Sequence, residues 1–284
     1  MIFYYHDDEH NNFGDELNRW LWPKLVPDHI LNAESDATVY GIGTVLHDGI
    51  AEQPRKVLLG AGTGYGSPPD IDDTYTVYCV RGPLTAQRLG LGSGAACVDP
   101  AILVGDFFSY EGDKEYTYAY MPHYHQAIFN GEEWEQICAK AGIHYIDPRL
   151  KKGYSFEDVL KEIAKAEVLL SEAMHGAIVA DALRVPWIPV RTTSSILAFK
   201  WQDWAASLEM EYRPNHIYWK GDALKRSSLI RRMIWEGARI QFQMIRRFVT
   251  PQLSDNSIYR QRNEEIKNHI QTFVREIENG KLSL

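Results

Sequence analysis

Cysteine is scarce in this chain of 284 residues, and its three cysteines, Cys79, Cys97 and Cys138, form no C-x-x-C pair. An odd number of widely spaced cysteines predicts neither a disulfide framework nor a zinc site. Such a composition suits a reducing compartment. We therefore expect a cytoplasmic protein whose functional site holds no metal.

Three further features are lacking: an excess of basic residues, a long apolar run and a secretory leader. The formal net charge of −8 argues against general binding of nucleic acid. No run approaches the roughly 20 apolar residues that cross a bilayer. The chain also begins without the basic start and apolar stretch of a signal peptide. We expect a soluble protein, or one held peripherally at the inner face of the membrane.

The chain does contain an alternation of apolar strand-like runs and amphipathic helices. With 45% hydrophobic residues it can bury a large core. The alternation predicts an α/β fold with mostly parallel sheets. We expect two facing Rossmann-like halves, residues 1–108 and 109–222, followed by C-terminal helices in residues 223–284. The expected strands are 2–5, 39–42, 56–59, 76–80, 116–121, 144–146, 168–170 and 187–190, and the expected helices are 15–25, 83–89, 132–141, 156–165, 175–183, 224–250 and 261–278.

One buried strand, 168–170, leads directly into Ser171, Glu172 and His175 at the start of a helix. In an open α/β sheet, ligands bind beyond the carboxyl ends of the strands, where backbone N–H groups of the next helix attract an anion. This position predicts a phosphate or carboxylate site. The alternative is a helix cap with a histidine satisfied inside the core.

Polar residues also follow two other strands of the first half. Arg81 precedes a helix that begins with Pro83. A guanidinium in this position could bind a carboxylate or phosphate through two parallel hydrogen bonds. Its alternative role is a surface ion pair. Asn12 and Asp15 follow the first strand and offer the donors and acceptors that sugar hydroxyls need. Asp15 could instead cap the first helix.

The second half contributes two more pairs. His123 and His125 leave a strand exit two residues apart and predict phosphate or sugar contacts, or an acid–base group, because no third ligand supports a metal. Lys200 and Trp204 share one helical face, which could contact an anionic sugar or phosphate. The competing interpretation is aromatic packing beside an extended lysine.

The glycines from Gly60 to Gly66 alternate at every second position and no helix follows them. They therefore depart from the G-x-G-x-x-G pattern, and we expect no nicotinamide or flavin cofactor. Glycines of this kind let the backbone closely approach a ligand or a neighbouring loop.

The segment 225–247 holds seven Lys or Arg residues and one acid, Glu236. It predicts a long helix with apolar residues on one face and basic residues on the opposite face. The two interpretations are a packing helix with a solvated polar face and a surface that binds anionic lipid. The apolar set is Ile230, Met233, Ile234, Met244, Ile245 and Phe248, and the basic set is Lys225, Arg232, Arg239 and Arg246.

An ordered set of motifs resembles the polysaccharide pyruvyl transferase family, in its branch of bacterial exopolysaccharide ketal-pyruvate transferases. The motifs are NNFGDELN (11–18), GIGT (41–44), VRGPLT (80–85), VDPA (98–101), MPHYH (121–125), SEAMHGAIVADALRVPW (171–187) and KWQDW (200–204). The resemblance implies a glycosyltransferase-B-like fold. It also implies transfer of the pyruvyl unit of phosphoenolpyruvate onto two sugar hydroxyls as a cyclic ketal, with release of phosphate and without another cofactor.

The resemblance places His175 in the phosphoenolpyruvate site. Many members of the family carry an arginine two residues earlier, where this chain has Ala173, so we expect a second cation from Arg81 or Lys200. We therefore expect the donor to bind at Arg81, Ser171, His175, Gly176 and Lys200.

Catalytic roles follow from the same chemistry. We expect Glu172, with a raised pKa, to protonate the donor's methylene carbon, and His123 or His125 to accept protons from the sugar. The acceptor side is Asn12, Asp15 and Trp204. The acceptor is a sugar of a cell-surface polysaccharide or its lipid-linked precursor. Two other functions stay open: a nucleotide-sugar-dependent glycosyltransferase and a sugar-binding protein without catalysis.

Overall fold

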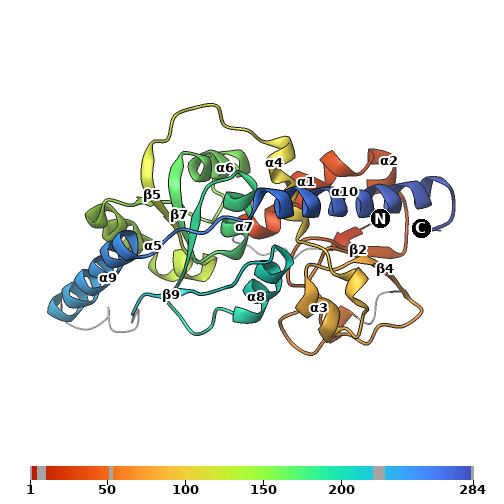
Figure 1. Ribbon diagram of the computed structural model, residues 1–284, viewed down its shortest axis with the longest axis horizontal. Helices are drawn as coiled ribbons and strands as arrows, with labels where there is room; N and C mark the ends of the chain where they lie inside the picture. The colour runs from red at the N-terminus through yellow and green to blue at the C-terminus, as the bar shows by residue number, and fades with distance from the viewer. Residues whose placement is uncertain (1, 5–10, 51–53, 220–227, 283–284) are drawn as a thin grey trace.

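Two parallel sheets organise the chain in a computed structural model that describes residues 2–4, 11–50, 54–219 and 228–282 (Figure 1). Every pair of neighbouring strands among the described residues is parallel, so the predicted α/β class is confirmed. The first sheet has the order β1 (Ile2–Tyr4), β2 (Ala37–Tyr40), β3 (Arg55–Leu59), β4 (Tyr75–Cys79). The second has the order β6 (His144–Tyr145), β5 (Tyr116–Met121), β7 (Ala166–Ser171), β8 (Trp187–Arg191), β9 (Asn215–His216).

The second sheet reverses its direction of growth between β5 and β7. The chain starts at β5, adds β6 on one side, and then returns to add β7, β8 and β9 on the other. A crevice forms at such a reversal, outside the carboxyl ends of the strands, and ligands bind there. Among the described strands, the first sheet grows in chain order and has no such reversal.

Helices cover both sheets, and the sequence predicted most of them with shifted ends. α5 differs most, because it begins at Tyr124 and is capped by His123, whereas the expected start was near Glu132. β9, α2 and α4 were not predicted. The α-helices are α1 (Phe13–Leu25), α2 (Asp28–Leu31), α3 (Pro83–Arg88), α4 (Val104–Phe107), α5 (Tyr124–Ala141), α6 (Phe156–Ala164), α7 (Met174–Ala182), α8 (Ala198–Ser207), α9 (Ser228–Phe248) and α10 (Asn256–Glu278); short 3-10 turns are η1 (Asp48–Ile50), η2 (Ser93–Ala95) and η3 (Pro100–Leu103).

Alternate side chains of the second sheet enter two different cores, as the two-residue period of a strand requires. Ala119 and Leu169 pack with α6 and α7, whereas Tyr120 and Leu170 pack with α5 and α9. The sheet is therefore buried on both faces, which is typical of parallel sheets.

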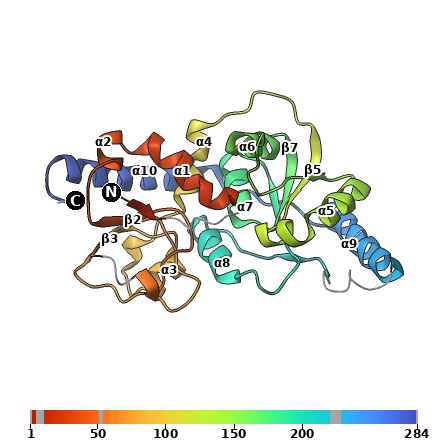
Figure 2. The same cartoon turned by 180° about the vertical axis from the view of Figure 1, so that it is seen from behind.

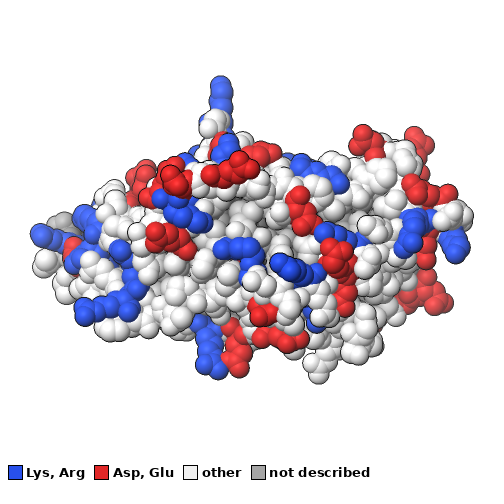
Figure 3. Space-filling view, turned by 45° about the horizontal axis from the view of Figure 1, so that its top comes forward, with Lys and Arg blue, Asp and Glu red and all other residues white. Residues whose placement is uncertain are grey.

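The α9 helix stands at one end of the long axis, where Lys and Arg side chains gather (Figures 1 and 3). The sequence-based assignment of its faces was wrong in part. Ile230, Met233, Met244 and Phe248 are exposed, because α9 packs through another face instead, formed by Trp235, Ala238, Phe242 and Ile245. The predicted basic residue Lys225 lies outside the described residues. Among the described helices, none is long and apolar enough to cross a membrane.

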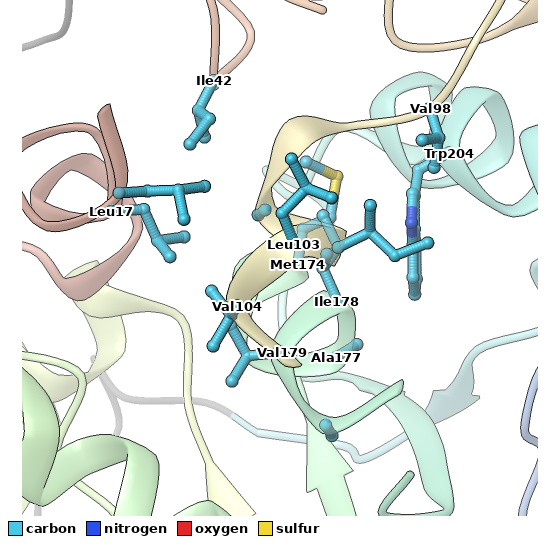
Figure 4. Packing of buried hydrophobic residues seen from close by; sticks show 14 of the residues in the cluster. Leu17, Ile42, Val98, Leu103, Val104, Met174, Ala177, Ile178, Val179 and Trp204 are labelled. Carbon is cyan, nitrogen blue, oxygen red and sulfur yellow. The ribbon is translucent and has the colours of Figure 1, made fainter. Parts of the chain in front are cut away.

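One continuous core joins the two sheets. It contains Leu17 of α1, Val39 of β2, Leu103 of η3, Ala177 of α7 and Phe273 of α10. Close to its centre, η3 and α4 pack against α7 (Figure 4). The α10 helix runs back along the first sheet and packs on β4, so the chain returns to the half in which it began (Figure 2).

A buried ion pair anchors α8 to the first half. Asp203 of α8 accepts from Arg81 Nε at 2.9 Å, and from Thr85 N at 2.9 Å and Thr85 Oγ1 at 2.6 Å. Neither Arg81 nor Asp203 is exposed. Because Gly82 at the start of α3 has no capping side chain, Asp203 caps α3 from outside. A Cβ on Gly82 would lie 2.3 Å from the carbonyl oxygen of Asp203, so this contact requires glycine.

We expect Asp203→Ala to lower the free energy of unfolding by about 3–5 kcal/mol, because it leaves the Arg81 charge buried without its partner. Urea unfolding followed by tryptophan fluorescence would measure the change. Gln202→Ala is the matched control, since Gln202 is an exposed neighbour on the same helix. Equal stability of the two variants would contradict an anchoring role for the pair.

Candidate active site

A cavity of about 370 Å³ lies at the carboxyl ends of both sheets, and both halves of the chain contribute to its walls. The first half contributes the segments that follow β1, β2 and β3. The second half contributes the exits of β5 and β7 and one turn of α8. The lining residues used below are Asn12, Gly14, Asp15, Thr44, Tyr65, His123, Tyr124, His125, Ala173, Met174, His175 and Lys200.

Three helices begin at this cavity. Asn12 caps α1 by accepting from Gly14 N, and His123 caps α5 by accepting from His125 N. Ala173 stands at the start of α7, where no side chain caps the helix. The amino end of a helix carries partial positive charge and free N–H donors. The convergence of three such ends favours an anionic ligand.

Lys200 adds a cationic side chain to the same cavity. Its Nζ lies 3.4 Å from Tyr65 Oη, across the space between the halves. Burial lowers the pKa of Lys200 to about 8, and the charge of Arg81 lowers it further while Asp15 opposes the change. The ammonium is therefore poorly solvated, and an anion could restore the interactions it has lost.

His175 faces a buried carboxylate. Its Nε2 lies 3.6 Å from Asp99 Oδ2, and neither atom has a hydrogen-bond partner among the described residues. The other oxygen of Asp99 accepts from Ala101 N, which fixes the carboxylate. A carboxylate on one side of an imidazole orients the ring, and a histidine held in this way can serve as an acid–base group.

The opposite nitrogen of His175 lies against the first half. A Cβ on Gly14 would be 2.5 Å from His175 Nδ1, so only glycine at this helical position lets the ring sit there. The imidazole therefore rests between α1 of one half and Asp99 behind it.

His123 is a partly buried histidine of the cavity wall. Burial lowers its pKa to about 3, and the nearby charges of Lys200 and His125 act in the same direction. The ring is neutral at physiological pH and is already used as a helix cap. His125 stacks against Tyr124, with ring centroids 4.1 Å apart. Both predicted histidines thus line the cavity.

Asn12 and Asp15 form a polar pair on the first-half wall. Asn12 Nδ2 donates to Asp15 Oδ2 at 2.7 Å, and both residues line the cavity. Asn12, not Asp15, caps α1. An amide and a carboxylate in this arrangement match the donor and acceptor pattern of sugar hydroxyls.

Glu172 does not line the cavity. Its side chain is fully buried, and its carboxylate accepts from Thr192 N at 2.6 Å, Thr192 Oγ1 at 2.5 Å and His123 N at 3.1 Å. Burial raises the pKa of Glu172, as expected, although the hydrogen bonds from Thr192 and His123 oppose the rise. The carboxylate joins the ends of β5, β7 and β8, and it lies behind the cavity wall.

Three more predicted site residues lie outside the cavity. Ser171 is buried and donates to the carbonyl oxygen of Ala173. Gly176 allows close packing, because a Cβ there would be 2.5 Å from Met121 Sδ. Trp204 is buried against Trp187, with ring centroids 5.2 Å apart. Trp204 lies one turn of α8 after Lys200 and is buried in the core, so it cannot contact an acceptor sugar beside Lys200.

Arg81 lies one layer behind the cavity. Its guanidinium donates to Asp203, to Thr44 Oγ1 at 2.7 Å and to the carbonyl oxygen of Thr63 at 3.0 Å. Thr44 does line the cavity. Arg81 therefore orients Thr44 and adds positive potential without reaching the cavity itself.

The sequence did not single out Asp99 or Tyr65. Asp99 belongs to the VDPA motif at 98–101, to which the sequence assigned no chemistry, and its partner His175 lies far along the chain. Tyr65 lies within the glycine run, and the expected close approach of loops is confirmed there. A Cβ on Gly64 would be 2.5 Å from Thr44, and one on Gly62 would be 2.2 Å from Arg81.

A group of metal-type ligands lies apart from the cavity lining, under α10. The ligand atoms of Cys79, Cys97 and His269 lie within 4.8 Å of one another. Burial, followed by the hydrogen bond with Cys97, raises the pKa of Cys79, which favours the neutral thiol. None of these three residues lines the cavity.

We expect Glu172→Gln to lower the free energy of unfolding by about 1–3 kcal/mol, because the glutamine amide would direct N–H groups at buried donors. Thermal unfolding by circular dichroism would measure the change. Glu167→Gln is the matched control, since Glu167 lies on the same strand and is exposed. A normal melting temperature together with lost turnover would instead identify Glu172 as a group that takes part in the chemistry.

Comparison with known proteins agrees with the motif-based resemblance. The family model of polysaccharide pyruvyl transferases matches residues 4–194, a span that contains every cavity-lining residue named above except Lys200. The succinoglycan biosynthesis protein ExoV of Rhizobium meliloti (strain 1021) is 40% identical over 218 residues, covering 75% of this chain and 67% of that protein. No solved structure matches the chain significantly. The chain therefore belongs to the polysaccharide pyruvyl transferase family.

Proposed function

We propose that this protein transfers the pyruvyl group of phosphoenolpyruvate to two hydroxyls of a sugar, in a cell-surface polysaccharide or its lipid-linked precursor. The product is a cyclic pyruvate ketal, and phosphate is released. The observation that carries the proposal is the convergence of three helix amino ends, Lys200 and His175 on one cavity. The cavity volume falls within the usual range of about 300–1,000 Å³ for small-molecule sites.

The donor carries a carboxylate and a phosphate, and the cavity offers a distinct positive group for each. The open amino end of α7, with Ala173 and Met174 on the wall, suits one anion. Lys200 suits the other, from the opposite side. No metal or further cofactor is required by this arrangement, since helix ends and a cation can neutralise the leaving phosphate.

Proton transfer is assigned to His175 with Asp99 behind it. Protonated His175 gives its proton to the methylene carbon, which becomes a methyl group as positive charge develops on the central carbon. The first sugar hydroxyl attacks that carbon and returns a proton to His175. The phosphate then leaves, the second hydroxyl attacks, and its proton departs with the phosphate. His125 or Asp15 is placed to assist the second transfer.

The acceptor sugar is assigned to the first-half wall, where Asn12 and Asp15 lie opposite the donor groups. In this assignment residues 1–108 form the acceptor side and residues 109–222 the donor side, as in a glycosyltransferase-B-like enzyme. The reaction takes place in the cytoplasm, where phosphoenolpyruvate is available.

We expect the purified protein to release phosphate from phosphoenolpyruvate only when a suitable acceptor is present, tested with lipid-linked or model galactosides, glucosides and mannosides. Mass spectrometry would detect the ketal on the sugar. Release of a nucleotide from nucleotide sugars, without phosphate from phosphoenolpyruvate, would identify a glycosyltransferase. Retained sugar binding without any turnover would identify a binding protein.

In the same assay, His175→Gln should lower turnover by about 100- to 10,000-fold, as expected for a lost acid–base group. His29→Gln, at an exposed position on α2, is the matched control. If the His175→Gln protein had normal turnover, the acid–base group would have to be His125 or Asp15. The assignment of phosphoenolpyruvate as the donor would be unaffected.

The pH dependence of the reaction provides a further test. Lys200 has a pKa of about 8, so it is positive below that pH and loses its charge as the pH rises through it. We expect kcat/KM for phosphoenolpyruvate to fall above this pH, because the neutral amine no longer attracts the donor. Lys200→Arg should abolish that fall, since arginine stays charged. Identical pH profiles of the two proteins would show that another group controls donor binding.

A further inference from the structure

The α9 helix presents an apolar face to solvent. Six large apolar side chains of this helix are exposed, Phe248 by 71%, Leu229 and Met233 by 66% and Met244 by 55%, with Ile240 and Ile230 less so. Single exposed apolar residues are ordinary on protein surfaces, but a contiguous group marks an interaction site. We refer to Leu229, Ile230, Met233, Ile240, Met244 and Phe248 as the outer face of α9.

This outer face is distinct from the face through which α9 packs. With about 100° of rotation per residue, the six residues fall within a single arc of about 100°. Trp235, Ala238, Phe242 and Ile245 occupy a different arc and are buried against α5 and the second sheet. The helix is therefore apolar on two faces, and its own fold accounts for only one of them.

Arginines border the outer face. Within Ser228–Phe248 the chain places five arginines and one acid, Glu236, although the whole protein carries a net charge of −8. Arg232 and Arg247 are exposed, whereas Arg239 is paired with Glu236 at 2.8 Å. Figure 3 shows basic side chains gathered at this end of the molecule. An anionic partner complements this local charge.

The position of α9 leaves the outer face accessible. The helix forms one end of the long axis (Figures 1 and 2), and the side chains of its outer face are exposed among the described residues. A second copy of the chain fits less well, because it would bring the same row of arginines against itself.

We propose that α9 docks the protein on an anionic lipid bilayer. The helix lies in the plane of the interface, with the outer face among the upper acyl chains and the arginines at the level of the lipid phosphates. The assignment is independent of the pyruvyl transfer proposed above, since it rests on residues that do not line the cavity.

Flotation with vesicles tests this docking. Wild-type protein should float with vesicles of phosphatidylcholine and phosphatidylglycerol and should stay behind with vesicles of phosphatidylcholine alone. Phe248→Ser combined with Met233→Ser should weaken binding at least tenfold. Phe129→Ser is the control, since Phe129 is 76% exposed on α5 and does not belong to the outer face.

The charge contribution is tested separately. Removing each arginine should weaken binding about fivefold, from about 1 kcal/mol per basic residue near the surface. Arg232→Gln with Arg247→Gln should therefore bind about 25-fold more weakly and with less sensitivity to salt. Arg213→Gln is the control, because Arg213 is 82% exposed elsewhere.

Three outcomes would overturn the proposal: wild-type protein that binds neither vesicle, binding that the Phe248→Ser and Met233→Ser changes leave intact, or a dimer in light scattering that those changes dissociate. The last result would make the outer face an interface between copies. Circular dichroism of every variant checks folding, and exposed positions of this kind are expected to preserve it.

Discussion

The buried carboxylate of Glu172 holds the edge of the second sheet on which the cavity is built. It accepts hydrogen bonds from the backbone that follows β5 and from the residue that follows β8, while its own backbone belongs to the exit of β7. The start of α5 and the start of α7 are thereby kept side by side. Burial of a charged carboxylate costs free energy unless it is fully hydrogen-bonded. The groups that donate to Glu172 are therefore held in a single arrangement. The positive helix ends that favour an anion depend on that arrangement.

The sequence predicted much of the site because parallel strands bring their carboxyl ends together. Asn12, Asp15, His123, His125, His175 and Lys200 were expected from their positions, and all of them line the cavity. Glu172 and Arg81 occupy equally suggestive positions but lie behind it. Their partners, Thr192 and Asp203, are distant along the chain, and no local pattern reveals that a charge already has a partner. Asp99 was missed for the same reason, because its relation to His175 exists only after folding.

The helices show a similar limit. Periodicity predicted the location of α9 correctly, since apolar residues recur at helical spacing. It could not say which of two apolar faces turns inward, because that depends on the shape of α5 and on Tyr120 and Leu170 of the sheet. The strands were predicted more accurately. A strand that is buried on both faces is a short continuous apolar run, and this pattern leaves few other choices for its position in the sequence.

The contact between Gly14 and His175 has a consequence for motion. The imidazole belongs to one half of the chain and the backbone that supports it belongs to the other, with no Cβ between them. Asp99 also belongs to the first half, so a movement that separated the halves would remove both the backbone of Gly14 and the carboxylate of Asp99 from the ring. The position of His175 relative to Gly14 and Asp99 therefore depends on the packing of the two halves against each other.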